Sequence, residues 1–241
     1  MAIAMIVNQI RQMLNEKSQR HSADLVKLGK DVQEGPLSGN IILMSKTPQV
    51  QAMATIFRDG ETENDEFIFY FDRMAALLIQ TALDCHKFKP AQVTTPLDIT
   101  YSGLKSAGVM SAVIVLRGGS CLEIGLKRTI HDCPTGRMLI QSNYRTGEPE
   151  LHYLKLFPDI AQHETVLLLD PQVSSGGSAL MAAKVLIDHG VAEEKIVFVT
   201  CLAGRMGVKR LLNVFPRIRV VAAEVVENNE RRWIEERYLG C

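Results

Sequence analysis

The feature that most constrains the fold is a series of five short, almost uninterrupted apolar runs. All of them follow Pro90, and they read SAVIVLR, RMLIQS, TVLLLD, KIVFVTC and RVVAAEV. Strands that are apolar on both faces are typical of parallel sheets covered by helices on two sides. Helical segments are predicted between the runs, at about 119–130, 176–189 and 205–213. The sequence therefore predicts an α/β fold with a Rossmann-like, mostly parallel sheet and helices on both faces.

The chain ahead of these runs is predicted to contain a helical arm and then the start of the domain. Residues 1–34 carry apolar side chains at helical spacing and form the arm, and residues 35–241 form the domain. A short strand is expected at 41–44. Thr47 and Pro48 are suited to the cap and first position of a helix, and a longer helix is expected over 66–86.

The bulk composition limits the classes of partner. Lys and Arg number 27 and so do Asp and Glu, so no overall field favours nucleic acid or an acidic membrane. The 5 cysteines have no CxxC spacing and the 6 histidines no metal spacing, so no metal site of the protein's own is predicted. No apolar run approaches the roughly 18 residues that span a bilayer, and the start does not resemble a signal peptide. A cytoplasmic protein is expected.

One strand-to-helix junction predicts a phosphate site. In TVLLLDPQVSSGGSAL an apolar strand ends at Asp170, and a helix follows a loop made of Ser174, Ser175, Gly176, Gly177 and Ser178. Free N–H groups at a helix N-terminus attract anions, glycines allow close approach, and hydroxyls bind phosphate oxygens. An acid beside a phosphate would repel it, so Asp170 is expected to face sugar hydroxyls or a metal. The alternative is an ordinary turn with serine capping.

Other phosphate motifs are absent from this sequence. It has no GxxxxGK[ST], which excludes the common nucleoside-triphosphate loop, and RGGSCLEIG does not match the dinucleotide pattern GxGxxG.

At this point the sequence resembles the uracil phosphoribosyltransferase family. The loop LLLDPQVSSGGSA is similar to that family's DPMLATGGS pattern. Four further segments match in the same order: IFRDGETENDEFIFYFDRMAALLIQTAL, TPLDITYSG, VLRGGSCLEIGL and TGEPELHYLKLFPDIA. The arm looks like the linker between the kinase and transferase-like halves of uridine kinases. The resemblance implies a type I phosphoribosyltransferase fold.

The resemblance also implies a reaction and its residues. The family transfers ribose 5-phosphate from phosphoribosyl diphosphate to uracil, giving UMP and diphosphate. Asp170 would hold the ribose hydroxyls and the Ser174–Ser178 loop the 5-phosphate. Arg117, Gly118 and Gly119 would meet the diphosphate, with Mg²⁺ bridging its oxygens. A homodimer or higher homo-oligomer is expected, since the family is commonly dimeric.

Two departures from the family pattern concern the diphosphate. The arginine that normally follows LIQ is replaced by Ser142, and the next arginine is Arg145, which the resemblance makes the candidate to clamp diphosphate in its place. The family's TPTG reads TPLD here, so Asp98 replaces a glycine. Asp98 could disturb the backbone or repel diphosphate, although a solvated turn residue is the simpler interpretation.

The third departure is the C-terminal tail. The family ends in a glycine- and aspartate-rich segment that reads the uracil edge, whereas this chain ends EVVENNERRWIEERYLGC. We predict that ENNERRWIEER is a solvated helix face and that Trp233 anchors the tail on the core. The alternative is that Trp233 and its neighbours rebuild a pocket for the base. Glu235 and Glu236 stand where Gly-Asp is expected.

Two hypotheses follow. The first is a pyrimidine-salvage transferase that uses phosphoribosyl diphosphate and Mg²⁺. The second is a transferase-like module that binds nucleotide and has a regulatory or assembly role, for example in a uridine kinase.

Overall fold

The computed structural model describes residues 38–143, 148–226 and 232–240. The predicted arm, 1–34, lies outside the described residues. No helix in the described ranges is long and apolar enough to cross a membrane.

The core of the fold is an eight-stranded sheet. Its strand order is β1-β10-β9-β7-β4-β5-β6, with the short β8 also paired to β9. All pairings are parallel except that of β5 with β6, which is antiparallel. The strands are β1 (Ile41–Leu43), β4 (Met110–Leu116), β5 (Thr135–Ser142), β6 (Pro149–Lys155), β7 (Thr165–Leu169), β8 (Gln172–Val173), β9 (Ile196–Gly204) and β10 (Arg219–Val226). The five apolar runs correspond to β4, β5, β7, β9 and β10, which confirms the predicted mostly parallel sheet.

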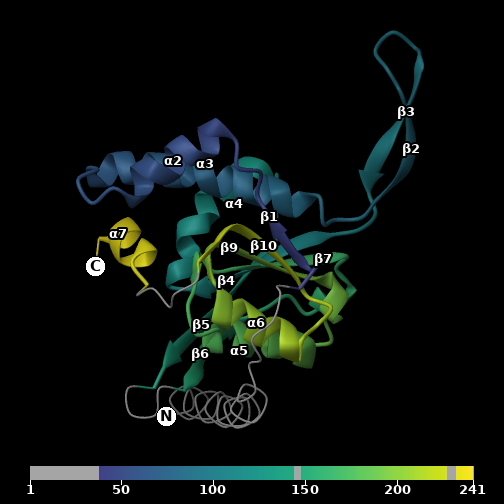
Figure 1. Cartoon of the computed structure of the whole chain (residues 1–241). Helices are drawn as coiled ribbons and strands as arrows, with labels where there is room; N and C mark the ends of the chain where they lie inside the picture. Colours follow the sequence, from purple (N-terminus) through teal and green to yellow (C-terminus); the bar gives the residue numbers. More distant parts are fainter. Residues whose placement is uncertain (1–37, 144–147, 227–231, 241) are drawn as a thin grey trace, which may run out of the picture.

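Helices cover both faces of this sheet, as predicted (Figure 1). One face carries α5 (Gly177–Asp188) and α6 (Arg205–Val214), and the other carries α2 (Pro48–Arg58), α3 (Asn64–Leu83), α4 (Glu123–Thr129) and α7 (Ile234–Leu239). Alternate residues of β7 serve the two cores: Val166 and Leu168 face α5, and Leu167 and Leu169 face α3. Because β7 is apolar on both faces, it can only lie in the middle of such a sandwich.

The helix starts follow local chemistry. Thr47 Oγ1 accepts a hydrogen bond from the Val50 amide at 3.3 Å and Pro48 is the first helical residue, which confirms the predicted start of α2. The segment predicted as one helix over 119–130 is instead a short 3₁₀ helix, Gly118–Leu122, followed by α4. A side chain on Gly125 would have its Cβ 2.8 Å from the Ala75 carbonyl carbon, so glycine lets α4 pack closely on α3.

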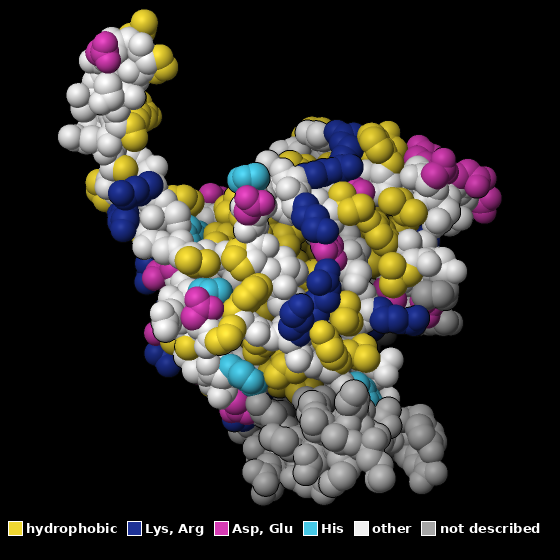
Figure 2. All heavy atoms as spheres, turned by 180° about the vertical axis from the view of Figure 1, so that it is seen from behind, with side chains coloured by type: hydrophobic (Ala, Val, Ile, Leu, Met, Phe, Trp, Pro, Cys, Tyr) yellow, Lys and Arg dark blue, Asp and Glu magenta, His cyan; other side chains and the backbone are white. Residues whose placement is uncertain are grey.

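A two-stranded ribbon that we did not predict projects from the body (Figures 1 and 2). It consists of β2 (Phe88–Thr94) and β3 (Thr100–Ser106), which pair in antiparallel fashion. Apolar side chains are exposed along it, including Leu97 at 80% and Leu104 at 70%. Asp98 lies exposed in its turn with φ 57°, a left-handed conformation that aspartate tolerates better than most residues. The solvated-turn interpretation of Asp98 is confirmed.

Candidate functional site

The site lies between β4 and β7, where the order of the strands in the sheet reverses. β4 and β7 are neighbours, but the chain continues from β4 to β5 on one side and from β7 to β9 on the other. Ligands of open α/β sheets bind in the crevice at the carboxyl ends of the strands at such a point. Arg117 directly follows β4 and Asp170 directly follows β7. The topology therefore brings these two predicted residues to one crevice.

The predicted phosphate loop lines a small pocket at this crevice. The pocket has a volume of about 110 Å³. Its wall contains Ser142, Asp170, Gln172, Val173, Ser174, Ser175, Gly176, Gly177, Ser178, Ala179 and Arg232. The structure thus brings Asp170 and all five loop residues together. Because α5 begins at Gly177, the amides of its first turn have no acceptor within the helix and are suited to an anion.

Glycines and α6 fix the conformation of this loop. Gly176 has φ 82°, and a Cβ there would lie 2.6 Å from the Gly207 carbonyl oxygen. Arg210 Nη1 donates a hydrogen bond to the Ser175 carbonyl oxygen at 2.8 Å. At Gly177 the nearest atoms to an added Cβ are those of the Pro149 ring, at 3.7 Å. Gly176 is therefore required by the backbone, whereas Gly177 leaves space that a ligand can use.

The predicted diphosphate loop faces the tail. The Leu116–Arg117 peptide bond is cis, and the Arg117 side chain is 59% exposed. Gly118 and Gly119 are buried. A Cβ on Gly118 would lie 2.6 Å from Glu235 Oε2 and 2.8 Å from Arg232 Nη2. Arg117 Nη2 lies 4.0 Å from Glu235 Oε1. Tail side chains therefore lie against the loop that was predicted to meet diphosphate.

Asp170 is buried and already paired. Its side chain is 1% exposed, and its Oδ1 accepts a short hydrogen bond from Arg232 Nη2. Burial raises the pKa of Asp170 to about 6, although the Arg232 guanidinium opposes this shift. Glu235 lies on the other side of the same guanidinium, 3.4 Å from Nη2. The predicted role of Asp170 toward ribose stays a prediction, because here its carboxylate is engaged by the protein itself.

The tail is anchored on α2 and α3. The Trp233 ring stacks on Phe57 at 6.1 Å between centroids and also contacts Phe67. Ile234 is fully buried, and Tyr238 donates a hydrogen bond to Asp72 Oδ1 at 2.7 Å. Trp233 is thus confirmed as an anchor. The prediction that the tail is a solvated helix face is wrong for most of its described part. Ile234 is buried and Arg232, Glu235 and Arg237 are half-buried, whereas Glu236 is exposed.

Sequence reasoning missed Gln172, Arg232 and Glu235. Gln172 is 2% exposed, and its Oε1 accepts the backbone N–H of Trp233 at 3.0 Å and of Ile234 at 3.4 Å. A buried amide must find such partners. Gln172 stands where the family pattern has methionine, and this substitution in DPQV was the available signal that something new docks beside the loop.

Arg145 lies outside the described residues, so its role stays a prediction. Ser142, at the end of β5, reaches the pocket wall. The described ranges contain no cluster of three or more His, Cys, Asp or Glu side chains that could hold a metal ion.

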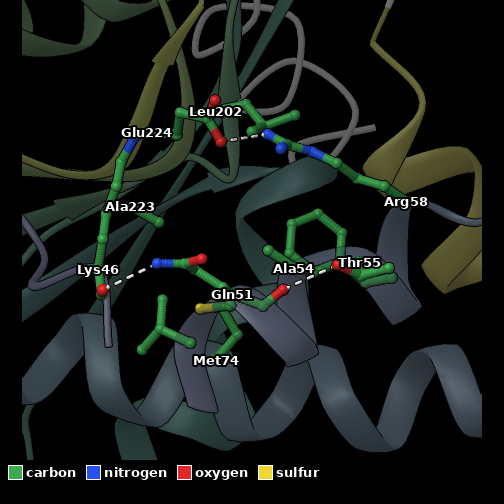
Figure 3. A pocket seen from close by; sticks show the side chains of 11 residues that line it. Lys46, Gln51, Ala54, Thr55, Arg58, Met74, Leu202, Ala223 and Glu224 are labelled. Atoms are coloured by element: carbon green, nitrogen blue, oxygen red, sulfur yellow. Dashed lines mark hydrogen bonds and ion pairs between the residues drawn. The ribbon is translucent and has the colours of Figure 1, made fainter. Parts of the chain in front are cut away.

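A second, larger cavity lies beneath α2 (Figure 3). Its volume is about 350 Å³. Its apolar floor includes Met74 and Leu202, and an ion pair of 2.6 Å between Arg58 and Glu224 crosses its rim. Among the predicted site residues that the structure describes, none lines it. Phe57 forms part of its wall and also carries Trp233, so the cavity and the tail share one side chain.

Comparison with known proteins gives the following. The family model described as uracil phosphoribosyltransferase matches residues 44–234. Uridine-cytidine kinase-like 1 of Mus musculus is 41% identical over 93% of this chain, and a uridine kinase of Saccharomyces cerevisiae is 34% identical over 100%. This chain spans only 40% and 51% of those two proteins. A uracil phosphoribosyltransferase of Dictyostelium discoideum is 37% identical, over 81% of this chain and 90% of its own length.

The fold also matches a solved structure, the AQ2163 protein from Aquifex aeolicus. The TM-score is 0.71 with 19% identity, over 82% of this chain and 97% of that one. At this identity the likeness concerns the fold alone.

Proposed function

This chain belongs to the uracil phosphoribosyltransferase family, and on that premise we propose that it is a nucleotide-binding, transferase-like module of a uridine-kinase-type protein. In this proposal the Ser174–Ser178 loop holds the phosphate of a pyrimidine nucleotide, and transfer of ribose is weak or absent. The chain has the type I phosphoribosyltransferase fold, and its phosphate loop has the complete pattern of glycines and hydroxyls.

The observation that carries the proposal is the engagement of Asp170 by Arg232. Transfer requires the sugar and the leaving diphosphate to be held in one defined geometry, with positive charge directed at the diphosphate. Here the acid predicted to hold the sugar is paired with the tail. The loop predicted to hold diphosphate faces the Glu235 carboxylate, which repels a polyanion. The phosphate half of the site is open and the other half is filled.

Relatives supply the context. The mouse and yeast proteins whose names include uridine kinase or uridine-cytidine kinase are about twice as long as this chain, which spans 40% and 51% of them. We propose that this domain senses nucleotide for such a kinase or helps it to assemble. A cytoplasmic location and a homo-oligomeric state belong to the same proposal.

The second candidate is an active transferase, in which the tail leaves and phosphoribosyl diphosphate enters with Mg²⁺. The intact phosphate loop and the 37% identity to the Dictyostelium protein favour it. In that case Mg²⁺ would be held by the diphosphate oxygens beside Arg117.

Calorimetry and an activity assay separate the two candidates. UMP, ribose 5-phosphate, phosphoribosyl diphosphate and uracil are titrated into the full chain, and UMP formation is then followed with Mg²⁺ present. Binding of UMP without turnover supports the module. Sustained UMP formation from uracil contradicts it and establishes the transferase. A chain that binds none of the phosphate ligands has no functional phosphate loop, which contradicts both.

A further inference from the structure

The guanidinium of Arg232 occupies a position between two carboxylates. Its Nη2 contacts Asp170 Oδ1 and lies 3.4 Å from Glu235 Oε2. Divalent cations such as Mg²⁺ are bound by carboxylate oxygens, and these two carboxylates are the acids nearest to the predicted diphosphate loop. Because the Arg232 guanidinium already lies against both carboxylates, the residues present leave no place for a metal ion between them.

Arg232 also has donors left for a ligand. A guanidinium carries five N–H groups, and the contacts to the two carboxylates use only Nη2. Nε is buried and has no hydrogen-bond partner among the described residues. A buried donor without an acceptor is costly, by about 1–3 kcal/mol. Arg232 lines the same pocket as Ser174–Ser178, so a phosphate on that loop would bring acceptor oxygens to this guanidinium.

The shape of the pocket limits the ligand further. A volume of about 110 Å³ has room for one phosphate group and little else. The adjoining space above Gly118 is taken by the Glu235 carboxylate, whose Oε2 would lie 2.6 Å from a Cβ at that glycine. Arg232 Nη2 would lie 2.8 Å from the same Cβ, so a second phosphate would have to displace both side chains. Two ionised carboxylates against one guanidinium leave a net negative charge in this cluster, which disfavours a second phosphate.

We infer that Arg232 replaces a divalent cation in this site, so that the chain binds phosphate monoesters without metal and discriminates against phosphoribosyl diphosphate. The inference rests on the proposed function, in which the Ser174–Ser178 loop holds a phosphate. Arg232 is then a ligand-binding residue and Glu235 sets the specificity. Arginine suits this role because it stays charged at all relevant pH values and pairs well with phosphate.

The test is calorimetry of the full chain with UMP, inorganic phosphate and phosphoribosyl diphosphate, each in EDTA and in Mg²⁺. The wild type is expected to bind UMP with the same Kd, within about twofold, in both buffers. Arg232→Ala is expected to weaken UMP binding in EDTA by about 10- to 100-fold, since it leaves two uncompensated carboxylates beside the phosphate. In this variant Mg²⁺ is expected to restore part of the affinity.

Two further variants control the experiment. Arg217→Ala removes a 65% exposed arginine that pairs with Glu193 and Glu194 before the amino ends of β9 and β10, away from the pocket, and it is expected to change nothing. Glu235→Gln removes the repelling charge and is expected to raise the affinity for phosphoribosyl diphosphate about tenfold relative to UMP. Wild-type circular dichroism and melting behaviour in each variant show that the fold is kept.

The outcomes separate the inference from the function beneath it. If the wild type binds UMP only with Mg²⁺, or if Arg232→Ala binds as the wild type does in EDTA, the inference is wrong and the phosphate loop stands. Binding of inorganic phosphate to the wild type in EDTA supports the inference, because it shows that the site takes a phosphate group without a metal. If no phosphate ligand binds in either buffer, the proposed function fails and the inference fails with it.

Discussion

The two halves of the site are built in different ways. The phosphate half is formed mainly by the backbone of the Ser174–Ser178 loop. The shape of this loop is set by Gly176 at φ 82°, by the close approach of Gly207, and by a hydrogen bond from Arg210 to the Ser175 carbonyl oxygen. The tail half is formed by side chains, because Arg232 forms ion pairs with both Asp170 and Glu235. A backbone cradle keeps its geometry when single charges change, whereas a charged cluster responds to pH and to each substitution. The difference teaches that binding and transfer can be lost separately within one crevice.

The largest expected effect is on the phosphate half. Gly177→Val places two methyl groups in a pocket of about 110 Å³, where the added Cβ would lie 3.7 Å from the Pro149 ring and 3.9 Å from Ser175 Oγ. We expect UMP binding to fall at least about 1000-fold, roughly 4 kcal/mol, with little change in melting temperature. Calorimetry measures the first and thermal unfolding the second. Gly60→Val is the matched control, because an added Cβ there meets nothing within 4 Å. Unchanged UMP affinity in Gly177→Val would remove the cradle from the proposal.

The next effect concerns the buried acid of the tail half. The pKa of Asp170 is raised from 3.8 to about 6 by burial, so between these pH values the folded chain holds a proton that the unfolded chain has lost. The stability from this proton is fully present below about pH 4 and is lost as the pH rises through 6. We expect the free energy of unfolding of the wild type to fall by about 3 kcal/mol more than that of Asp170→Asn over this range. Urea unfolding at several pH values measures the difference, and parallel curves for the two proteins would contradict the raised pKa.

A smaller effect is expected where α7 is anchored. Tyr238 donates to Asp72, whose side chain is 5% exposed, so Tyr238→Phe leaves a buried carboxylate without this donor. A loss of about 2 kcal/mol in the free energy of unfolding is expected. Tyr153→Phe is the control, since Tyr153 is 43% exposed. Equal losses in the two variants would show that the hydroxyl of Tyr238 does not hold the tail.

The smallest effect is expected at the rim of the larger cavity. Arg58 and Glu224 form an ion pair of 2.6 Å, but their side chains are 37% and 33% exposed. Arg58→Ala is expected to cost less than about 1 kcal/mol, and less again in high salt, because water screens exposed pairs. Urea unfolding at low and high ionic strength measures this cost. A loss above about 2 kcal/mol would show that the cavity stabilises the fold.

Much of the fold could be predicted because burial leaves a pattern in the sequence. Strand β7 reads TVLLL and is buried throughout, and such runs identify the central strands directly. The ribbon β2–β3 escaped prediction because nearly all its residues are exposed, so neither strand has an apolar face to alternate with a polar one. The change from a 3₁₀ helix to α4 between Leu122 and Glu123 leaves no mark in the apolar pattern, so 119–130 was predicted as one helix.

The same contrast between local pattern and tertiary contact applies to the site. Asp170 and the Ser174–Ser178 loop are adjacent in the sequence, and their chemistry could be inferred from a single strand-to-helix junction. Arg232 approaches Asp170 from 62 positions away, and the tertiary contacts of the tail, such as Trp233 on Phe57 and its amide on Gln172, determine where it lies. The charged residues around Trp233 have the pattern of a solvent-exposed helix, so the sequence alone could not show that Arg232 and Glu235 lie in the site.

Trp233 is the chain's only tryptophan, and it adjoins Arg232 in the sequence. Its indole ring packs against Phe57 and Phe67, the contacts that hold the tail on α2 and α3. If a ligand displaces the tail together with the Arg232 guanidinium, the environment of this ring changes, and we expect the emission of the indole to shift. Tryptophan fluorescence can therefore report, without an added dye, whether the tail is docked on the protein.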